Sequence, residues 1–185
     1  MKQVEALSHF LKVLNSLSIP YMITGAYAVS YYGMPRATHD LDVVIEIAAK
    51  DVEKTCRGLK KTCEIDEKMI ENAVQYRTHF SVIYSKGDLR ADFWVLKNKP
   101  IENTKFERRQ KISLFGIPTF MISPEDIVLT KLDWYKRSKN TKHMDDAVGI
   151  IKVQGKKLDV IYIKDVFDKL GIEKYWEQAV RSSKQ

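Results

Sequence analysis

The sequence has few cysteines and no long hydrophobic run. Only Cys56 and Cys63 occur among 185 residues, which excludes a disulfide-rich scaffold. Seven residues apart on a predicted helix, the two thiols would share one face, and this indicates buried free thiols rather than a redox or zinc site. No apolar segment approaches the roughly 20 residues that cross a membrane. The charged N-terminal segment differs from a secretory signal, so we expect a cytoplasmic protein with no membrane partner.

Internal repeats and low-complexity segments are also lacking, and glycine and proline are scarce, at 8 and 5 residues. Apolar side chains make up 44% of the chain, which is enough for one proper core or for a domain with a small appendage. We therefore expect a globular protein.

Hydrophobic periodicity predicts an α+β fold, a mixed sheet flanked by helices and followed by a helical C-terminal region. We place a catalytic core at residues 1–122 and the helical region, packed on it, at residues 123–185. Helices are expected at 3–17, 26–33, 49–61, 124–137, 143–153, 159–170 and 173–183. Strands are expected at 20–24, 41–47, 78–85, 89–97 and in a hairpin at 110–122 that turns near Gly116. The first hairpin would turn at 86–88, and residues 62–77 have only a weak pattern, typical of a connection.

Positive charge is unevenly spread along the chain. In total 31 Lys and Arg face 24 Asp and Glu. Residues 97–111 hold six bases and two acids, and residues 131–142 hold five bases and one acid. Such clusters attract a polyanion such as RNA or a nucleoside triphosphate, although a solvated surface is an equally good explanation.

Two aspartates stand one residue apart at the start of an apolar strand. Since alternate side chains of a strand point the same way, Asp40 and Asp42 would project together while Leu41 and Val43 enter the core. Two like charges at roughly 5 Å repel by ~3 kcal/mol at an effective dielectric constant near 20. A bound divalent cation would reverse this effect, and Mg²⁺ takes oxygen ligands of this kind.

A third carboxylate, Asp92, lies inside the strand "RADFWV". If that strand pairs beside the Asp40 strand, three carboxylates converge. Three acids can hold two cations, and such a pair stabilises both the attacking and the leaving oxygen of a phosphoryl transfer. Gly25, between a strand and a helix, would let backbone amides face the β- and γ-phosphates of a nucleotide.

The order of these residues resembles the DNA polymerase β-like nucleotidyltransferase superfamily. Its hallmark is Gly-Ser or Gly-Gly, a spacer of similar length, an acid-x-acid pair and a later acid between apolar residues. The segment "GAYAVSYYGMPRATHDLDV" is most similar to a small prokaryotic branch that includes abortive-infection and toxin–antitoxin nucleotidyltransferases. "SPEDIVLTKLDW" and "KHMDDAVGI" resemble later motifs of that branch, so the resemblance covers residues 20–150.

The resemblance implies a magnesium-dependent transferase of nucleoside monophosphate. Asp40, Asp42 and Asp92 would be the catalytic and metal-binding residues, holding two Mg²⁺ ions, with Asp92 helping to deprotonate the acceptor. Asp146 would be a further polar residue of the site. The residues expected to bind the nucleotide are Thr24, Gly25, Ala26, Arg36, Thr38 and Lys131. Residue 26 departs from the family pattern, because alanine lacks the hydroxyl of the usual serine.

Simpler structural explanations exist for several of these residues. Asp40 and Asp42 could be a turn acid and a solvent-facing acid, and Arg90 could pair with Asp92. Lys131 could lie on a solvated helical face, and Asp145 and Asp146 could be surface acids near basic side chains. His39-Asp40 also occurs in HD-type phosphohydrolases, but those need the pair on a helix, whereas this pair enters a strand.

Three functions therefore stay open. The first is transfer from an NTP to an acceptor hydroxyl, with tRNA or another RNA as the acceptor that the basic segments favour. The second is a catalytically silent module of the same fold that binds RNA or protein. The third is modification of an antibiotic, although positive segments disfavour a cationic drug. The resemblance also raises an antitoxin as a protein partner.

Overall fold

The computed structural model describes residues 2–85 and 89–184. The expected turn at 86–88 lies outside these residues. The chain divides into two compact units, the first holding residues 1–26 and 37–121 and the second holding residues 27–36 and 122–185. The second unit thus includes a segment from the expected core, and the division into residues 1–122 and 123–185 stays a prediction about separate domains.

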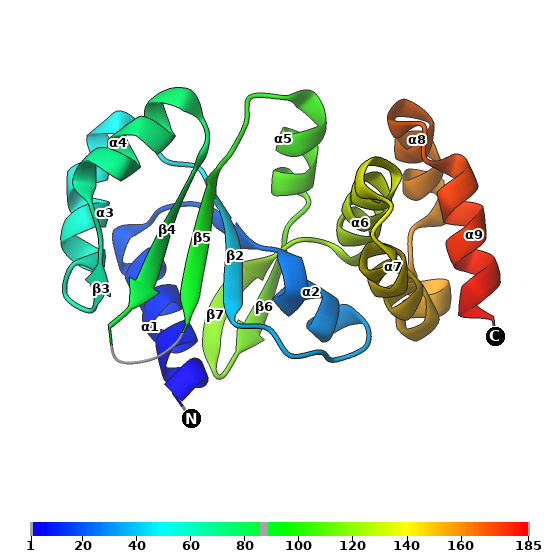
Figure 1. The fold of residues 1–185 in the computed structure, drawn as a ribbon, viewed down its shortest axis with the longest axis horizontal. Helices are drawn as coiled ribbons and strands as arrows, with labels where there is room; N and C mark the ends of the chain where they lie inside the picture. Colours follow the sequence, from blue (N-terminus) through cyan, green and yellow to red (C-terminus); the bar gives the residue numbers. More distant parts are fainter. Residues whose placement is uncertain (1, 86–88, 185) are drawn as a thin grey trace. The chain divides into compact units, whose positions relative to one another are not determined.

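The first unit contains a seven-stranded mixed sheet in the described part of the chain, with strand order β3-β4-β5-β2-β1-β7-β6 (Figure 1). The central strands β2 and β5 run parallel, and the others pair antiparallel except β1 with β7. The strands are β1 (Tyr21–Ile23), β2 (Asp40–Ile45), β3 (Cys63–Glu64), β4 (His79–Tyr84), β5 (Arg90–Val95), β6 (Gln110–Leu114) and β7 (Ile117–Met121). The expected mixed sheet of an α+β fold is confirmed.

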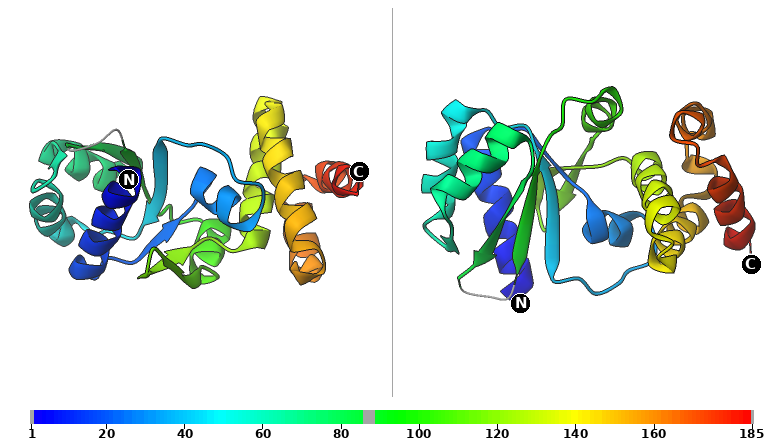
Figure 2. Two further views of the ribbon diagram at one scale, coloured as in Figure 1. Left: turned by 90° about the horizontal axis from the view of Figure 1, so that it is seen from below. Right: turned by 45° about the horizontal axis from the view of Figure 1, so that its top comes forward.

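The first unit also contains helices. They are α1 (Lys2–Leu17), α3 (Val52–Leu59), preceded by a 3₁₀ turn at Ala49–Asp51, α4 (Glu67–Tyr76) and α5 (Pro100–Glu107). Phe10 of α1 meets Phe93 and Tyr84 edge-on, at 6.2 Å between ring centroids in both pairs. Figure 2 shows α1, α3 and α4 grouped side by side against the sheet. The opposite face carries the polar residues of β2 and β5.

The second unit is helical. It contains α6 (Pro124–Ser138), α7 (Thr141–Gln154), a 3₁₀ turn at Gly155–Lys157, α8 (Val160–Leu170) and α9 (Glu173–Ser183), and α2 (Gly25–Tyr32) contributes its residues from Tyr27 onward. Ser123 caps α6 by accepting a hydrogen bond from the amide of Asp126, at 3.1 Å. Gly171 ends α8 in the left-handed conformation, with φ of 60°. Both caps agree with the sequence pattern.

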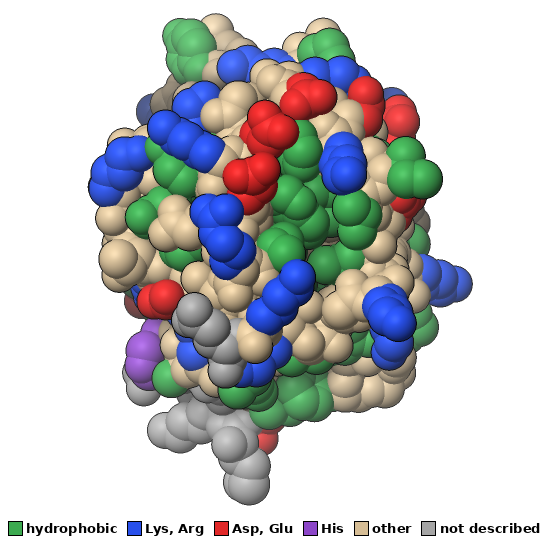
Figure 3. Space-filling model, turned by 90° about the vertical axis from the view of Figure 1, so that its right-hand side faces the viewer, with side chains coloured by type: hydrophobic (Ala, Val, Ile, Leu, Met, Phe, Trp, Pro, Cys, Tyr) green, Lys and Arg blue, Asp and Glu red, His purple; other side chains and the backbone are tan. Residues whose placement is uncertain are grey.

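One face of the molecule combines hydrophobic side chains with charges of both signs (Figure 3). Ile161 of α8 is 84% exposed. On this face the lysines and arginines are spread around a group of acids (Figure 3), so the face is not a uniform basic surface of the kind that a polyanion prefers.

Three elements differ from the sequence-based expectation. Residues 62–77 form β3 and α4, where a connection was expected, and α5 was not predicted. In α4 the buried side chains are Ile70 and Ala73, a stripe too narrow for a clear helical period. Cys63 lies in β3, whereas Cys56 lies in α3, so the two cysteines do not share a helix. Both are free and buried thiols, as expected.

None of the helices in residues 2–85 and 89–184 is long and apolar enough to span a membrane.

Candidate active site

The acidic residues singled out in the sequence lie on one face of two neighbouring strands. The parallel register of β2 and β5 places Asp42 opposite Asp92. Leu41 and Val43 are fully buried on the other face, so the alternating strand geometry turns Asp42 and Asp92 away from the core. Asp40 precedes them on the same face and is exposed. The pairing that the sequence could only assume is therefore present.

Asp92 is held by two neighbours on its own sheet face. Its Oδ1 accepts hydrogen bonds from the Ser81 hydroxyl and from Arg90 Nε, the latter at 2.8 Å. Arg90 Nη2 donates in turn to the Ser81 hydroxyl, at 3.1 Å. The side chain of Asp92 is only 14% exposed, so these bonds fix the position of a largely buried carboxylate.

Asp42 lies against Gly25. Its Oδ1 accepts a hydrogen bond from Trp94 Nε1 at 3.3 Å. A Cβ built on Gly25 would stand 2.0 Å from Asp42 Oδ2, and Gly25 has φ of +65°. The position requires glycine for two reasons, since an L side chain would be strained there and would collide with the carboxylate.

The remaining predicted residues of this unit surround the carboxylates through local bonds. The Thr24 amide donates to the Asp42 carbonyl at 2.9 Å. The Thr38 hydroxyl donates to the Asp40 carbonyl at 3.1 Å and accepts from the Asp40 amide at 3.3 Å. Ala26 is buried, with 7% of its surface exposed. Thr24 and Thr38 thus shape the backbone on which Asp40 and Asp42 stand.

The carboxylates offer the kind of donor atom that magnesium takes. All their donor atoms are oxygens, on adjacent strands, and the absent Cβ of Gly25 leaves space that Asp42 fills. Among the described residues, no three acidic, His or Cys side chains are already gathered closely enough to hold a metal. The role of Asp40, Asp42 and Asp92 as magnesium ligands therefore stays a prediction.

The second unit brings together three other residues that the sequence singled out. Asp146 Oδ1 accepts a hydrogen bond from Arg36 Nε at 3.0 Å, and Asp146 Oδ2 forms an ion pair with Lys131 Nζ at 2.9 Å. The side chains of Lys131 and Asp146 are only 3% and 4% exposed, and that of Arg36 is 26% exposed. The solvated-face explanation of Lys131 and the surface explanation of Asp146 are therefore wrong, whereas Asp145 is exposed as expected.

This ion cluster of Arg36, Lys131 and Asp146 has two cations for one carboxylate. Trp134 covers it, with its ring centroid 5.3 Å from Lys131 Nζ. The ring of His143 meets Trp134 edge-on at 5.3 Å. The cluster therefore carries a local excess of positive charge.

His143 should make the stability of the protein depend on pH. Burial, followed by the positive charge of Lys131, lowers the pKa of its imidazole below the ordinary value of 6.5. As the pH falls below 6.5, the unfolded chain binds this proton more readily than the folded chain does. The free energy of unfolding therefore decreases as the pH falls. Because His143 is partly exposed, we expect a decline well below the limit of about 1.4 kcal/mol per pH unit for one proton.

Urea denaturation between about pH 7.5 and 5.5 measures this decline. We expect a shallower decline in His143→Asn than in the wild type. Equal slopes in the two proteins would contradict the assignment.

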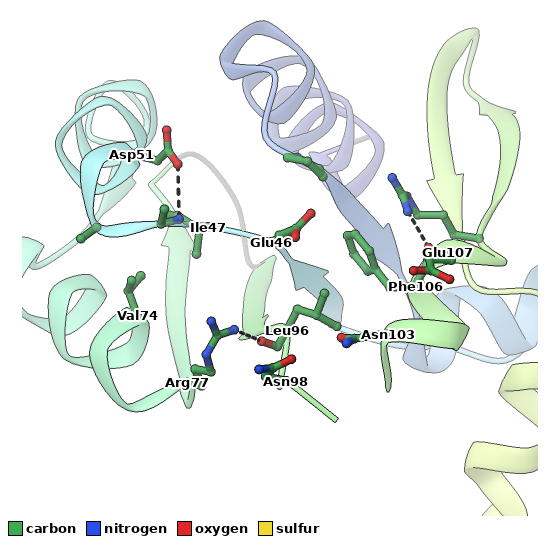
Figure 4. Close-up of a pocket in the computed structure, with 14 residues that line it drawn as sticks. Glu46, Ile47, Asp51, Val74, Arg77, Leu96, Asn98, Asn103, Phe106 and Glu107 are labelled. Carbon is green, nitrogen blue, oxygen red and sulfur yellow. Dashed lines mark hydrogen bonds between the residues drawn. The ribbon is translucent and has the colours of Figure 1, made fainter. Parts of the chain in front are cut away.

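A cavity of about 830 Å³ lies at the other end of the same strands (Figure 4). Glu46 and Ile47 follow β2, and Leu96 and Asn98 follow β5, whereas Asp40 stands at the beginning of β2. Arg77 borders the cavity and donates to the Leu96 carbonyl at 2.7 Å. The cavity is therefore distinct from the carboxylate site.

Sequence reasoning overlooked two polar neighbours of the carboxylates, Ser81 and Trp94. Trp94 stands two residues after Asp92 in the same strand. Because alternate side chains of a strand point the same way, the segment "RADFWV" already placed both side chains on one face. Ser81 meets Asp92 through the antiparallel register of β4 and β5, and that register follows only from the folded hairpin.

No family model matches the sequence, and a search of curated proteins found no match. The structure is similar to those of nucleotidyltransferases. An antigenic nucleotidyltransferase-like protein from Paracoccidioides brasiliensis is 15% identical with a TM-score of 0.61, covering 97% of this chain and 92% of the other. The antibiotic-resistance factor ANT(2'')-Ia, solved in complex with adenylyl-2''-tobramycin, is 14% identical with a TM-score of 0.59, covering 91% of this chain and 98% of the other.

A solution structure of the same resistance factor gives a TM-score of 0.59 at 13% identity, over 91% of this chain and 92% of the other. At such identities the likeness concerns the fold. The sheet that aligns Asp42 with Asp92, together with these comparisons, assigns the chain to the nucleotidyltransferase fold.

Proposed function

We propose that the protein is a magnesium-dependent nucleotidyltransferase, which moves a nucleoside monophosphate from an NTP to an acceptor hydroxyl and releases pyrophosphate. The observation that carries this proposal is the placement of Asp42 opposite Asp92 and beside Gly25. Like charges aligned on one face of a sheet repel each other, and the ion pair of Arg90 with Asp92 offsets part of this repulsion. The nucleotidyltransferase fold supports the same conclusion.

The carboxylates would perform the chemistry. Asp40, Asp42 and Asp92 would bind Mg²⁺, which when bound neutralises phosphate charge and stabilises the attacking and leaving oxygens. Asp92, held by Ser81 and Arg90, would accept the proton of the acceptor hydroxyl as a general base.

We expect the nucleotide phosphates to be bound at the beginning of helix α2, and the second unit by itself offers a group of cations. Gly25 and Ala26 begin helix α2, where free amides and the helix dipole favour an anion, and Thr24 and Thr38 would shape the backbone beside them. In the second unit, Arg36 and Lys131 are two cations that share the single carboxylate of Asp146. This excess of positive charge would balance phosphate oxygens.

We further propose that the acceptor is an RNA such as tRNA. The net charge of +7 supports this choice, because a positive protein attracts a polyanion. The resistance factor ANT(2'')-Ia has been solved with an adenylylated antibiotic, but the positive charge of this chain is less suited to a cationic drug. A toxin–antitoxin role with a protein antitoxin as partner remains part of the same proposal.

Incubation with each α-³²P-labelled NTP, Mg²⁺ and total tRNA tests the function. Label on RNA or on the protein itself is expected with the wild type and not with Asp40→Ala/Asp42→Ala. Label that persists in this double variant would contradict the assignment of the carboxylates.

Thermal unfolding separates a live enzyme from a catalytically silent module, for which Ala26 is the main argument. A ligand that binds only the folded state raises stability by mass action. We expect a higher Tm with Mg²⁺ and an NTP together than with either alone. A rise with RNA and none with Mg²⁺ and NTP would favour the silent module.

A further inference from the structure

The sheet face that carries the acids also carries an exposed aromatic pair. Along β4 and β5, the residues that alternate with buried Phe80 and Phe93 point to this face. They include His79 and Trp94, and Trp94 is 40% exposed. An exposed tryptophan alone is not unusual on a protein surface, but this one lies on the same sheet face as the acids.

His79 and Trp94 form a preorganised stack. They are direct partners in the antiparallel register of β4 and β5. Their ring centroids are 4.6 Å apart and the ring planes are inclined by 26°. We call this pair the aromatic platform. Packing of one ring against the other holds the indole in a fixed orientation before any ligand arrives.

The aromatic platform adjoins the acidic residues. Trp94 Nε1 donates to Asp42 Oδ1 at 3.3 Å, and Trp94 follows Asp92 on the same face of β5. A flat group that lies on Trp94 is thus held next to the carboxylates. The hydrogen-bonding group of the indole is already engaged by Asp42, so the ring itself is what the platform offers to a ligand.

We propose that the aromatic platform stacks a nucleobase next to the carboxylates, a step that rests on the proposed nucleotidyl transfer. Every base has a π-face, and stacking on an aromatic side chain is tolerant of base identity. Exposed aromatics on a sheet are a common way to bind unpaired bases. The base belongs either to the NTP or to the unpaired end of a single-stranded RNA acceptor, and both supply the same planar chemistry.

Fluorescence anisotropy of a labelled eight-nucleotide oligoadenylate measures RNA binding directly, without turnover. Loss of one stacked base weakens binding by about 5- to 150-fold, and we expect this in Trp94→Ala. Trp94→Phe keeps a ring and should retain most of the affinity. The matched control is Tyr76→Ala, which removes an aromatic residue that is 68% exposed on α4 and should leave binding unchanged.

Two further arms identify the source of the base. Titration with ATP in the absence of RNA tests binding of the nucleotide. An abasic oligomer of the same length tests binding of the phosphate backbone alone. Stacking by RNA predicts that the oligoadenylate quenches Trp94 fluorescence and the abasic oligomer does not. Stacking by the nucleotide predicts that ATP quenches it instead. Wild-type affinity of Trp94→Ala for both probes would overturn the proposal.

The transfer assay separates this inference from the proposed function. Asp40→Asn should lose transfer and still stack the base, because the residue that bonds Trp94 is Asp42, which this variant leaves unchanged. If the wild type transfers no nucleotide but Trp94→Ala loses RNA binding, the proposed transfer function is contradicted and the aromatic platform is supported. Transfer that is unaffected by Trp94→Ala, with unchanged binding, would overturn the platform only.

Discussion

Replacement of Asp146 by alanine is expected to lower the free energy of unfolding by about 3–5 kcal/mol, because it leaves a buried cation without its partner. Lys131 Nζ lies 2.9 Å from Asp146, and both side chains are at least 96% buried. Arg36 is more exposed and can turn to solvent more readily than Lys131. Urea denaturation of Asp146→Ala against the wild type measures the loss.

Asp145→Ala is the matched control, since Asp145 is exposed on the same helix and surface substitutions change stability by about 0.5 kcal/mol or less. Equal effects of the two substitutions would show that the ion cluster does not support the fold.

The double variant Lys131→Met/Asp146→Leu distinguishes a structural from a functional role. Replacing a buried ion pair by apolar residues of similar size is often neutral or stabilising, so we expect stability close to that of the wild type. The same variant lacks the cation that we assign to the phosphates. Normal folding with lost transfer would support that assignment, and normal folding with full transfer would exclude Lys131 and Asp146 from the site.

The sequence was sufficient to place the carboxylates on their strands. The alternation of Asp40, Leu41, Asp42 and Val43 fixed which side chains share a face, because side chains in a strand alternate. Which strand lies beside β2 is a long-range matter, since β5 begins 50 residues after Asp40. The sequence analysis could only assume that pairing, because local pattern does not determine which strands are neighbours.

The ion cluster was harder to anticipate. Arg36, Lys131 and Asp146 come from a loop, α6 and α7, and their meeting depends on how these helices pack. From sequence, a lysine among apolar residues can snorkel to solvent or be buried with a partner. Local propensity cannot distinguish these, and the choice is made by an acid 15 residues away in the chain.

Replacement of Gly25 by alanine is expected to destabilise the protein by about 2–5 kcal/mol and to abolish nucleotide transfer. A residue with a side chain is strained by about 1–2 kcal/mol in the left-handed conformation, and Gly25 has φ of +65°. The new Cβ would also lie 2.0 Å from Asp42 Oδ2 and 2.9 Å from Asp42 Cβ. Rotation of the carboxylate relieves only the first contact, so the strand must move as well, which adds about 1–3 kcal/mol.

Gly116→Ala separates strain from collision. Gly116 has φ of +77°, and a Cβ there meets no atom of residues 2–85 and 89–184 within 4 Å. We expect this control to lose only the conformational part, about 1–2 kcal/mol, and to keep its transfer activity. Urea denaturation and the labelled-NTP assay on both variants test the comparison. Equal losses of stability would mean that contact between the new Cβ and Asp42 adds nothing to the conformational strain. Full transfer by Gly25→Ala would mean that the position of Asp42 is not critical, and the proposed metal site would then have to be abandoned.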